Sequence, residues 1–118
     1  MIVKATREGL IGQRTASGYV IDAVVPFVAL PAEMALGRFV RVWNERTPAL
    51  KNCYAIVLDV GPWNVNDDAY VFGGQRPQAE TGTDSTGRKT NGAGIDLGEK
   101  VWSKLGMTDN GSVYWEFL

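Results

Sequence analysis

The segment 58–68, with the sequence LDVGPWNVNDD, places a carboxyl group, an indole and two amides directly after an apolar run. Asp59 follows that run, Tyr54–Leu58, and burial at the end of a strand raises the pKa of a carboxyl group, so that it can hold a proton near neutral pH. Trp63 offers a flat ring face, and Asn64 offers an amide to hydroxyl groups. This combination suits acid/base catalysis on a polyhydroxylated substrate, with Asp59 as the leading acid/base residue.

The same residues also have structural interpretations, which stay open at this point. Asp59 can close the turn that follows it through a bond from its side chain to the backbone. Trp63 can belong to the core as well as to a binding surface. Asp67 and Asp68 are interpreted as solvated turn charges, because the sequence DDAY lacks the alternating oxygen-ligand spacing of a calcium loop. No metal site is therefore expected.

The composition excludes several classes of protein. The 118 residues contain no histidine and a single cysteine, Cys53, so a Ser-His-Asp or Cys-His mechanism within the chain is excluded and neither a zinc site nor a cofactor is expected. The formal net charge of −1 makes nucleic acid a poor partner. No apolar run approaches the ~18–20 residues of a membrane span, and the N-terminus lacks a signal-peptide pattern. We expect one domain, residues 1–118, that is monomeric and not inserted in a membrane.

The elements that must position these residues are mostly short strands. Runs of β-branched and aromatic residues, separated by tight turns, predict a mainly-β domain. Strands are predicted at Gly18–Val25, Phe39–Trp43, Tyr54–Val60 and Val113–Phe117, with a short edge strand at Met1–Thr6. Two helices interrupting such strands do not fit an alternating βαβ pattern, so a small barrel with helical connections is favoured.

The two predicted helices carry start and stop signals. The first spans Leu30–Leu36, with a proline in its first turn and a glycine directly after it. The second spans Asp96–Leu105, where Asp96 is a suitable N-cap, Glu99 completes a capping box and Gly106 is suited to the stop. Capping alone explains Asp96.

A long polar segment, residues 73–94, separates the segment 58–68 from the second helix. It is rich in Gly, Thr, Ser, Asp and Arg, and a connection of this length in a small domain is usually functional or mobile. Asn91, near its end, offers another amide to a hydroxylated ligand. We therefore predict that this insertion adjoins the same site.

Five short motifs occur in an order that resembles a known family. The chain reads TASGY (15–19), ALP (29–31), GRFVRVWN (37–44), AIVLDVGPW (55–63) and GIDLGEKVWSKLGM (94–107). This succession resembles the rare-lipoprotein-A-like (RlpA-like) double-psi β-barrel proteins, which are related to lytic transglycosylases, the first domain of expansins and family-45 endoglucanases. The resemblance implies a small six-stranded double-psi β-barrel, with two short helices and the long polar insertion, that acts on a polysaccharide through a groove lined with carboxyl groups.

The resemblance also implies roles for individual residues. Asp59 matches the catalytic aspartate of the Asp-x-Gly-Pro motif, and Asp96 matches an aspartate whose counterpart in expansins and endoglucanases is the general acid. Thr15 and Ser17 match the segment that lines the groove. Three features depart from the pattern. Phe27 stands where RlpA-type transglycosylases have a histidine, Asp-Val-Gly-Pro-Trp (59–63) replaces the commoner Asp-Arg-Gly-Pro-Phe, and the long insertion after Trp63 is atypical.

Three hypotheses of function follow. In the first, the protein cleaves the glycan strands of peptidoglycan at the bacterial cell wall or in the periplasm, as a lytic transglycosylase or a glycoside hydrolase, with Asp59 and Asp96 as catalytic residues. In the second, it is a non-catalytic, expansin-like module that binds cell-wall polysaccharide. In the third, the barrel is a structural component of a phage or a secretion system. Loss of the family histidine favours the second hypothesis, and retention of both aspartates favours the first.

Overall fold

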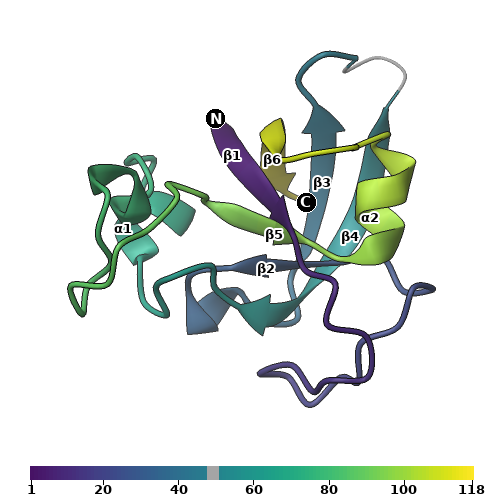
Figure 1. Cartoon of the computed structure of the whole chain (residues 1–118), viewed down its shortest axis with the longest axis horizontal. Helices are drawn as coiled ribbons and strands as arrows, with labels where there is room; N and C mark the ends of the chain where they lie inside the picture. Colours follow the sequence, from purple (N-terminus) through teal and green to yellow (C-terminus); the bar gives the residue numbers. More distant parts are fainter. Residues whose placement is uncertain (48–50) are drawn as a thin grey trace.

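The computed structural model describes residues 1–47 and 51–118, and its six strands close into a barrel (Figure 1). The order of the strands around the barrel is β1-β5-β2-β4-β3-β6. Two neighbouring pairs, β1 with β5 and β2 with β4, are parallel, and the other four pairs are antiparallel. The strands are β1 (Ile2–Arg7), β2 (Phe27–Leu30), β3 (Phe39–Asn44), β4 (Asn52–Val60), β5 (Ile95–Leu97) and β6 (Gly111–Phe117). The predicted mainly-β, six-stranded barrel is thus confirmed.

The core follows the alternation of side chains along the strands. Every second residue points into the barrel, and the inward positions other than Trp115 are small or β-branched, which suits a narrow barrel interior. Three of the predicted strands are confirmed with small changes at their ends, as β3, β4 and β6. The N-terminal strand also forms, but β1 lies between β5 and β6 and is therefore not an edge strand. The inward residues of these four strands are Val3, Ala5, Val40, Val42, Cys53, Ala55, Val57, Val113 and Trp115.

The predicted strand Gly18–Val25 is wrong, because this segment forms a turn-rich loop. Asp22 explains the difference: its Oδ1 accepts hydrogen bonds from the backbone N–H groups of Val24, at 2.9 Å, and Val25, at 3.1 Å. These bonds occupy donors that a strand would use for its ladder. The strand of this region is instead β2, which begins two residues later and is buried along its whole length.

Both predicted helices are shorter than expected. β2 includes Leu30, so the first helix is reduced to a single 3-10 turn, Glu33–Ala35. The second helix is α2 (Glu99–Lys104), and its N-cap is Gly98. The prediction that Asp96 caps this helix is therefore wrong, because Asp96 belongs to β5. The predicted stop is confirmed, since Gly106 follows the helix with a φ of 68°.

The long connection between β4 and β5 lies to one side of the barrel (Figure 1). It contains helix α1 (Asp68–Val71) and a 3-10 turn, Gln78–Thr81. The predicted polar insertion 73–94 is therefore structured, and several of its polar side chains bind one another. Within the described residues, no helix has the length and apolar character that crossing a membrane requires.

Candidate functional site: a row of carboxyl groups on the barrel

Two aspartates lie in one row across the sheet, on either side of a small residue. Asp96 of β5 and Asp59 of β4 are both paired with Ala29 of β2, which lies between them. Directly paired residues place their side chains on the same face of a sheet. With neighbouring strands about 4.8 Å apart, the two aspartate Cα atoms are roughly 10 Å apart. The sequence predicted that these residues share a site, and the strand pairing brings them to one face.

An irregularity in β2 sets this register. Val28 pairs with Val57, and the next residue, Ala29, pairs with Asp59, so that Leu58 is skipped. The extra residue in β4 acts as a β-bulge, a device that redirects a side chain next to a site. Without the skip, Ala29 would pair with Leu58, and Asp59 would lie out of line with Asp96.

Asp96 is a largely buried carboxyl group with one strong donor. Thr6, its paired neighbour on β1, donates its hydroxyl hydrogen to Asp96 Oδ1. Burial raises the pKa of Asp96 to about 6; the Thr6 hydrogen bond opposes this increase, and the negative charge of Asp59 adds to it. A carboxyl group with this pKa can both donate and accept a proton in mildly acidic or neutral solution.

Glu8 is the third acid of the site, and the sequence analysis missed it. It follows β1 directly, its backbone N–H donates to Leu97 O at 2.8 Å, and the residue is only 8% exposed. Burial, contact with the carboxyl group of Asp59, and the charges of Asp59 and Asp96 together raise the pKa of Glu8 to about 9. Glu8 directly follows β1, the strand that pairs with Asp96, and this position could have indicated its role. The pairing of β1 with β5 could not, however, be predicted from the sequence.

The segment 15–17, which the resemblance assigns to the lining of a groove, contacts Asp59. The backbone N–H groups of Ala16 and Val60 both donate to Asp59 Oδ1 at 2.9 Å. The hydroxyl groups of Thr15 and Ser17 bind each other at 2.9 Å, and the Ser17 N–H donates to the carbonyl oxygen of Leu58, next to Asp59. Ser17 is exposed, whereas Thr15 is buried at 7% exposure. Of the two hydroxyl groups, only that of Ser17 is presented to solvent.

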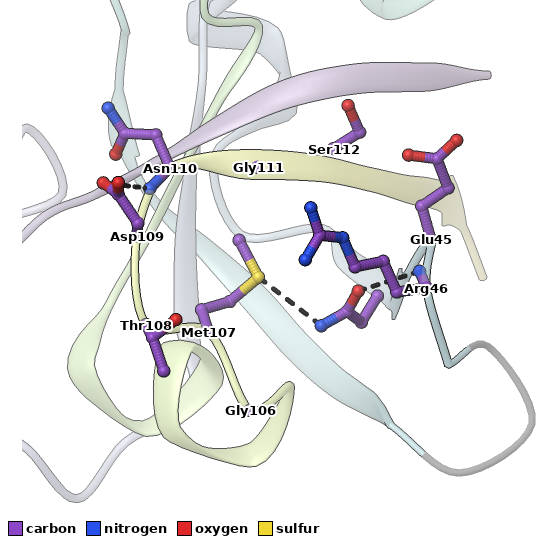
Figure 2. Close-up of a pocket in the computed structure, with 10 residues that line it drawn as sticks. Glu45, Arg46, Gly106, Met107, Thr108, Asp109, Asn110, Gly111 and Ser112 are labelled. Carbon is purple, nitrogen blue, oxygen red and sulfur yellow. Dashed lines mark hydrogen bonds between the residues drawn. The ribbon is translucent and has the colours of Figure 1, made fainter.

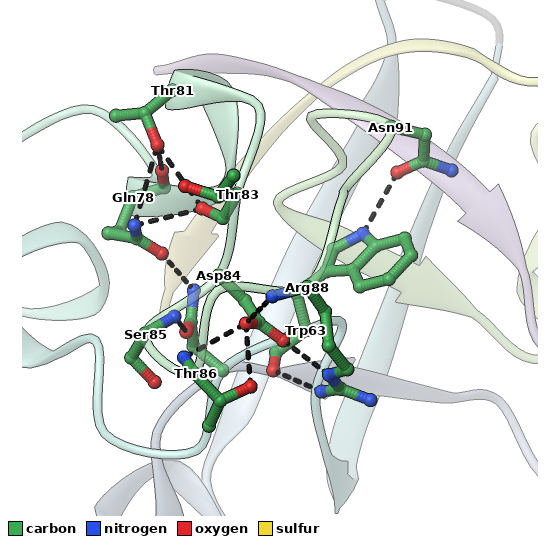
Figure 3. A network of polar contacts seen from close by, with 10 residues as sticks. Trp63, Gln78, Thr81, Thr83, Asp84, Ser85, Thr86, Arg88 and Asn91 are labelled. Carbon is green, nitrogen blue, oxygen red and sulfur yellow. Dashed lines mark hydrogen bonds and ion pairs between the residues drawn. The ribbon is translucent and has the colours of Figure 1, made fainter.

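Trp63 and Asn91 both belong to the connection between β4 and β5, and their side chains bind each other (Figure 3). The indole Nε1–H of Trp63 donates to Asn91 Oδ1 at 2.9 Å. The Arg88 guanidinium lies 5.9 Å from the centre of the Trp63 ring and donates to the Trp63 carbonyl oxygen at 3.1 Å. Trp63 is half-buried and Asn91 is exposed, so one ring face and one amide group remain available to a ligand.

Asn64 does not have the predicted binding role. It is 3% exposed, its Nδ2 donates to Gln78 Oε1 at 2.7 Å, and its Oδ1 accepts the Ser85 N–H at 2.9 Å. The Asn64 amide therefore connects the start of the β4–β5 connection to Gln78 and Ser85, which lie later in it. Because both ends of the amide are used inside the protein, the sequence-based assignment of Asn64 to a hydroxylated ligand is corrected.

Phe27 forms an apolar contact with α2 rather than a further polar member of the site. Its ring is fully buried, and Tyr19 packs against it edge-on with ring centres 5.3 Å apart. A Cβ atom on Gly98 would lie only 2.4 Å from the Phe27 ring, so the absence of a side chain at Gly98 makes room for the phenyl group. The position that holds a histidine in RlpA-type enzymes is therefore closed to solvent here.

A surface pocket lies away from the carboxyl groups. A pocket of about 350 Å³ is formed by residues 44–46 and 106–112, between the end of β3 and the segment that leads into β6 (Figure 2). Its best-defined polar groups are already bonded, since Asn44 Nδ2 donates to Leu105 O at 2.7 Å and Asp109 Oδ1 accepts the Asn110 N–H at 2.8 Å. The carboxyl row is not part of this pocket. Within the part of the chain that the structure describes, no three acidic, Cys or His side chains are grouped as metal ligands.

Comparison with known proteins supports the fold and gives no activity. No curated protein matches the sequence. Among solved structures, the barrel is similar to cerato-platanin 3 from M. perniciosa (MpCP3), with a TM-score of 0.58 and 10% sequence identity over 100% of this chain and 94% of that one. At this identity the likeness concerns the fold alone, and the more specific assignment to the RlpA-like proteins stays a prediction. A family model matches residues 1–116, and the chain therefore belongs to the family described as Domain of unknown function (DUF8814).

Proposed function

We propose that the protein cleaves glycosidic bonds in a cell-wall polysaccharide, with the glycan strands of peptidoglycan as substrate and carboxyl groups as the acid/base catalysts. The observation that carries this proposal is the alignment of Asp96 and Asp59 on either side of Ala29. Glycosidic cleavage needs a proton donor for the leaving oxygen and a second group that stabilises or traps the positive charge on the sugar. Two carboxyl groups of unequal pKa on one face can supply both functions.

Asp96 is assigned as the proton donor and Asp59 as the anionic partner. The raised pKa of Asp96, about 6, keeps a substantial fraction of this carboxyl group protonated in mildly acidic solution. Asp59 accepts two backbone N–H bonds on one oxygen, and these bonds hold its carboxyl group in a fixed orientation. Asp59 is thereby placed to stabilise the oxocarbenium-like transition state or to act as a base.

The substrate class rests on the groups around the two aspartates and on the resemblance. Ser17 presents a hydroxyl group beside Asp59, and Trp63 with Asn91 presents a ring and an amide on the insertion. Aromatic faces and short polar side chains are the groups that bind sugar rings and their hydroxyl groups. Peptidoglycan is preferred over other β-1,4-linked polymers because the five-motif succession is similar to that of the RlpA-like proteins. The proposed place of action is accordingly the bacterial cell wall.

Digestion of purified sacculi tests this proposal. Wild-type protein is expected to release soluble muropeptides, whereas Asp59→Asn and Asp96→Asn are each expected to lower the rate by roughly 100-fold or more. Asp68→Asn is the matched control, since Asp68 is an exposed carboxyl group on α1. Products with anhydro ends would identify a transglycosylase and products with reducing ends a hydrolase. The absence of any soluble product from the wild type would contradict cleavage.

One observation favours a second candidate, a binding module without turnover. Phe27 replaces the histidine of RlpA-type transglycosylases, and its ring is fully buried. Co-sedimentation with sacculi distinguishes the two candidates. Wild-type protein that sediments with sacculi, yet releases no muropeptide over a long incubation, would support binding alone. In that case Asp59→Asn would leave the bound fraction nearly unchanged, because no bond is broken.

A further inference from the structure

Among the three acids Glu8, Asp59 and Asp96, Glu8 is the one with a buried carboxyl oxygen that has no hydrogen-bond partner in the part of the chain that the structure describes. Its Oε2 is buried and receives no hydrogen from any donor among the described residues. Asp96, by contrast, accepts the Thr6 hydroxyl hydrogen, and Asp59 accepts two backbone N–H groups. A buried polar atom without a partner is costly, and a buried negative charge without a donor is more so. An ionised Glu8 side chain would therefore be strongly disfavoured at this position.

The neighbours of Glu8 are acceptors rather than donors. The Glu8 side chain is in hydrogen-bond contact with the carboxyl group of Asp59 on β4, and the charge of Asp96 on β5 also acts on it. Arg7, the preceding residue, is engaged elsewhere, since its guanidinium forms bonds of 2.6 and 2.7 Å with Glu99 of α2. Two carboxyl groups in hydrogen-bond contact favour a shared proton, because like charges so close disfavour ionisation of both.

We propose that Glu8 is a positioning residue which remains protonated at neutral pH and donates its carboxyl hydrogen to Asp59. The proton belongs on Glu8 because the two partners differ in their donors: Asp59 Oδ1 already accepts two backbone N–H groups, whereas the buried Glu8 Oε2 has no donor among the described residues. The hydrogen bond from Glu8 then stabilises and orients the Asp59 carboxylate. The consequence for catalysis rests on the proposed function, whereas the sharing of the proton does not.

This arrangement assigns one state to each of the three acids. Glu8 is neutral, Asp59 accepts the hydrogen bond from Glu8, and Asp96 is the group that changes its protonation in the mildly acidic range. A chain without histidine can in this way obtain an acid and an anion of different pKa from carboxyl groups alone. Because the three groups interact, their titration belongs to the cluster, and variants are needed to assign each step to a residue.

The decisive experiment is a direct titration of the free protein. In a 13C-labelled sample, the Glu8 side-chain carboxyl carbon is followed by NMR between pH 3 and pH 10. We expect Glu8 to be protonated at pH 7 and to ionise only near pH 9, in line with its pKa of about 9. In Asp59→Asn the negative neighbour is lost, so the midpoint of Glu8 should decrease by about one pH unit or more. A Glu8 carboxyl group that is ionised at pH 7, or whose midpoint is the same in Asp59→Asn, would overturn the proposal.

A pair of substitutions at Glu8 tests the positioning role. Glu8→Gln keeps a neutral donor in the same place, and is expected to retain muropeptide release within about threefold of the wild type. Glu8→Ala loses the donor to a charged acceptor, and is expected to lower release by roughly 10- to 100-fold and to shift the pH profile of the remaining activity. Equal rates for these two variants would contradict the role. Glu33→Gln, at an exposed glutamate, is the control.

The two measurements separate failure of this inference from failure of the proposed function. The titration needs neither substrate nor turnover, and in the wild type it needs no variant that could fail to fold. If Glu8 is protonated but the protein releases no muropeptide, the proposed Glu8–Asp59 pair stands and the proposed cleavage is excluded. An ionised Glu8 in a protein that cleaves sacculi would exclude the pair and retain the enzyme.

Discussion

Glu8 and Asp84 are both buried carboxyl groups, yet their environments push their pKa values in opposite directions. Glu8 is 8% exposed and Asp84 is 4% exposed. Asp84 accepts the N–H and hydroxyl hydrogens of Thr86 and the N–H of Arg88 on one oxygen, and the Arg88 guanidinium at 2.6 Å on the other (Figure 3). Burial raises the pKa of Asp84, but these hydrogen bonds outweigh it and lower the pKa to about 2. Glu8, without donors, has a pKa of about 9.

The difference separates a structural carboxyl group from one that can serve a site. Asp84 closes the turn 84–88, and all of its hydrogen-bonding capacity is used within the insertion. On the barrel, Glu8 Oε2 is buried without a hydrogen-bond donor among the described residues, so it can hold a proton or bind a ligand. The pKa values of carboxyl groups are shifted both on the barrel and in the insertion. The two roles are distinguished by whether the neighbours are hydrogen-bond donors, as for Asp84, or other carboxyl groups, as for Glu8.

Removal of the Asp84 carboxylate should have the largest effect on stability. In Asp84→Ala the Arg88 guanidinium loses its partner, and the N–H groups of Thr86 and Arg88 lose their acceptor. We expect a decrease in Tm of roughly 10 °C or more, measured by thermal unfolding. Glu8→Gln, which removes an acid that has no donors, should leave Tm near the wild-type value at pH 7. A larger loss of stability in Glu8→Gln than in Asp84→Ala would reverse the comparison.

Addition of one methyl group at Gly98 should have the next largest effect. The new Cβ atom would lie 2.4 Å from the Phe27 ring, which is fully buried and cannot move into solvent. Overpacking of this kind lowers the free energy of unfolding by about 1–3 kcal/mol, measurable by urea denaturation. Gly9→Ala is the matched control, since a Cβ atom there meets only an ordinary contact at 3.7 Å from Glu99 Oε1. Equal losses in the two variants would show that Phe27 is not tightly packed against Gly98.

The free energy of unfolding should depend on pH in opposite directions through the barrel acids Glu8 and Asp96 and through Asp84. For Glu8 and Asp96, whose pKa values are raised in the folded state, the stabilising contribution is complete below the unfolded-state values of 4.5 and 3.8, and is lost as pH increases through about 6 for Asp96 and about 9 for Glu8. For Asp84 the contribution is present above 3.8 and is lost as pH decreases through about 2.

Denaturation curves measured from pH 2 to pH 10 test this dependence. The free energy of unfolding of the wild type should decrease between about pH 4 and pH 9, and Glu8→Gln should remove most of the decrease above pH 7. Asp84→Asn should leave this alkaline decrease in place and weaken the acidic one. An alkaline decrease that persists unchanged in Glu8→Gln would assign it to another group.

The smallest effect is expected for the indole N–H of Trp63. Trp63→Phe keeps an aromatic ring but loses the hydrogen bond to Asn91 Oδ1. We expect the affinity for sacculi to decrease by roughly two- to fivefold, measured by co-sedimentation in the non-cleaving Asp59→Asn background. Trp63→Ala, which also removes the ring, should weaken binding further. Unchanged binding in both variants would place the polysaccharide away from the insertion.

The sequence was informative where local pattern and strand pairing agree. Alternation along Phe39–Trp43 and the apolar run before Asp59 predicted β3 and β4. It failed at Gly18–Val25, where strand propensity was overruled by the turn that Asp22 caps. A side chain that binds the backbone a few residues away left little trace in the apolar pattern.

The errors within the site have a different physical cause. Asp96 looked like a helix cap because its sequence context is that of a cap, but β5 pairs with β1 some ninety residues earlier and takes Asp96 into the sheet. Glu8 was missed because its burial depends on the same distant pairing. Asn64 was assigned to a ligand because polar residues surround it in the sequence. In the structure its amide is instead hydrogen-bonded to residues of the same connection. Residues that depend on distant partners were the ones that local patterns could not place.

The parallel pairing of β1 with β5 has a consequence for biosynthesis. The bond between Thr6 and Asp96 joins residues 90 apart in the chain, and β1 precedes the whole insertion while β5 follows it. Loops of this length close late, because contacts distant in the sequence cost more entropy than local ones. A nascent chain in which β5 has not yet emerged from the ribosome therefore has no assembled carboxyl row.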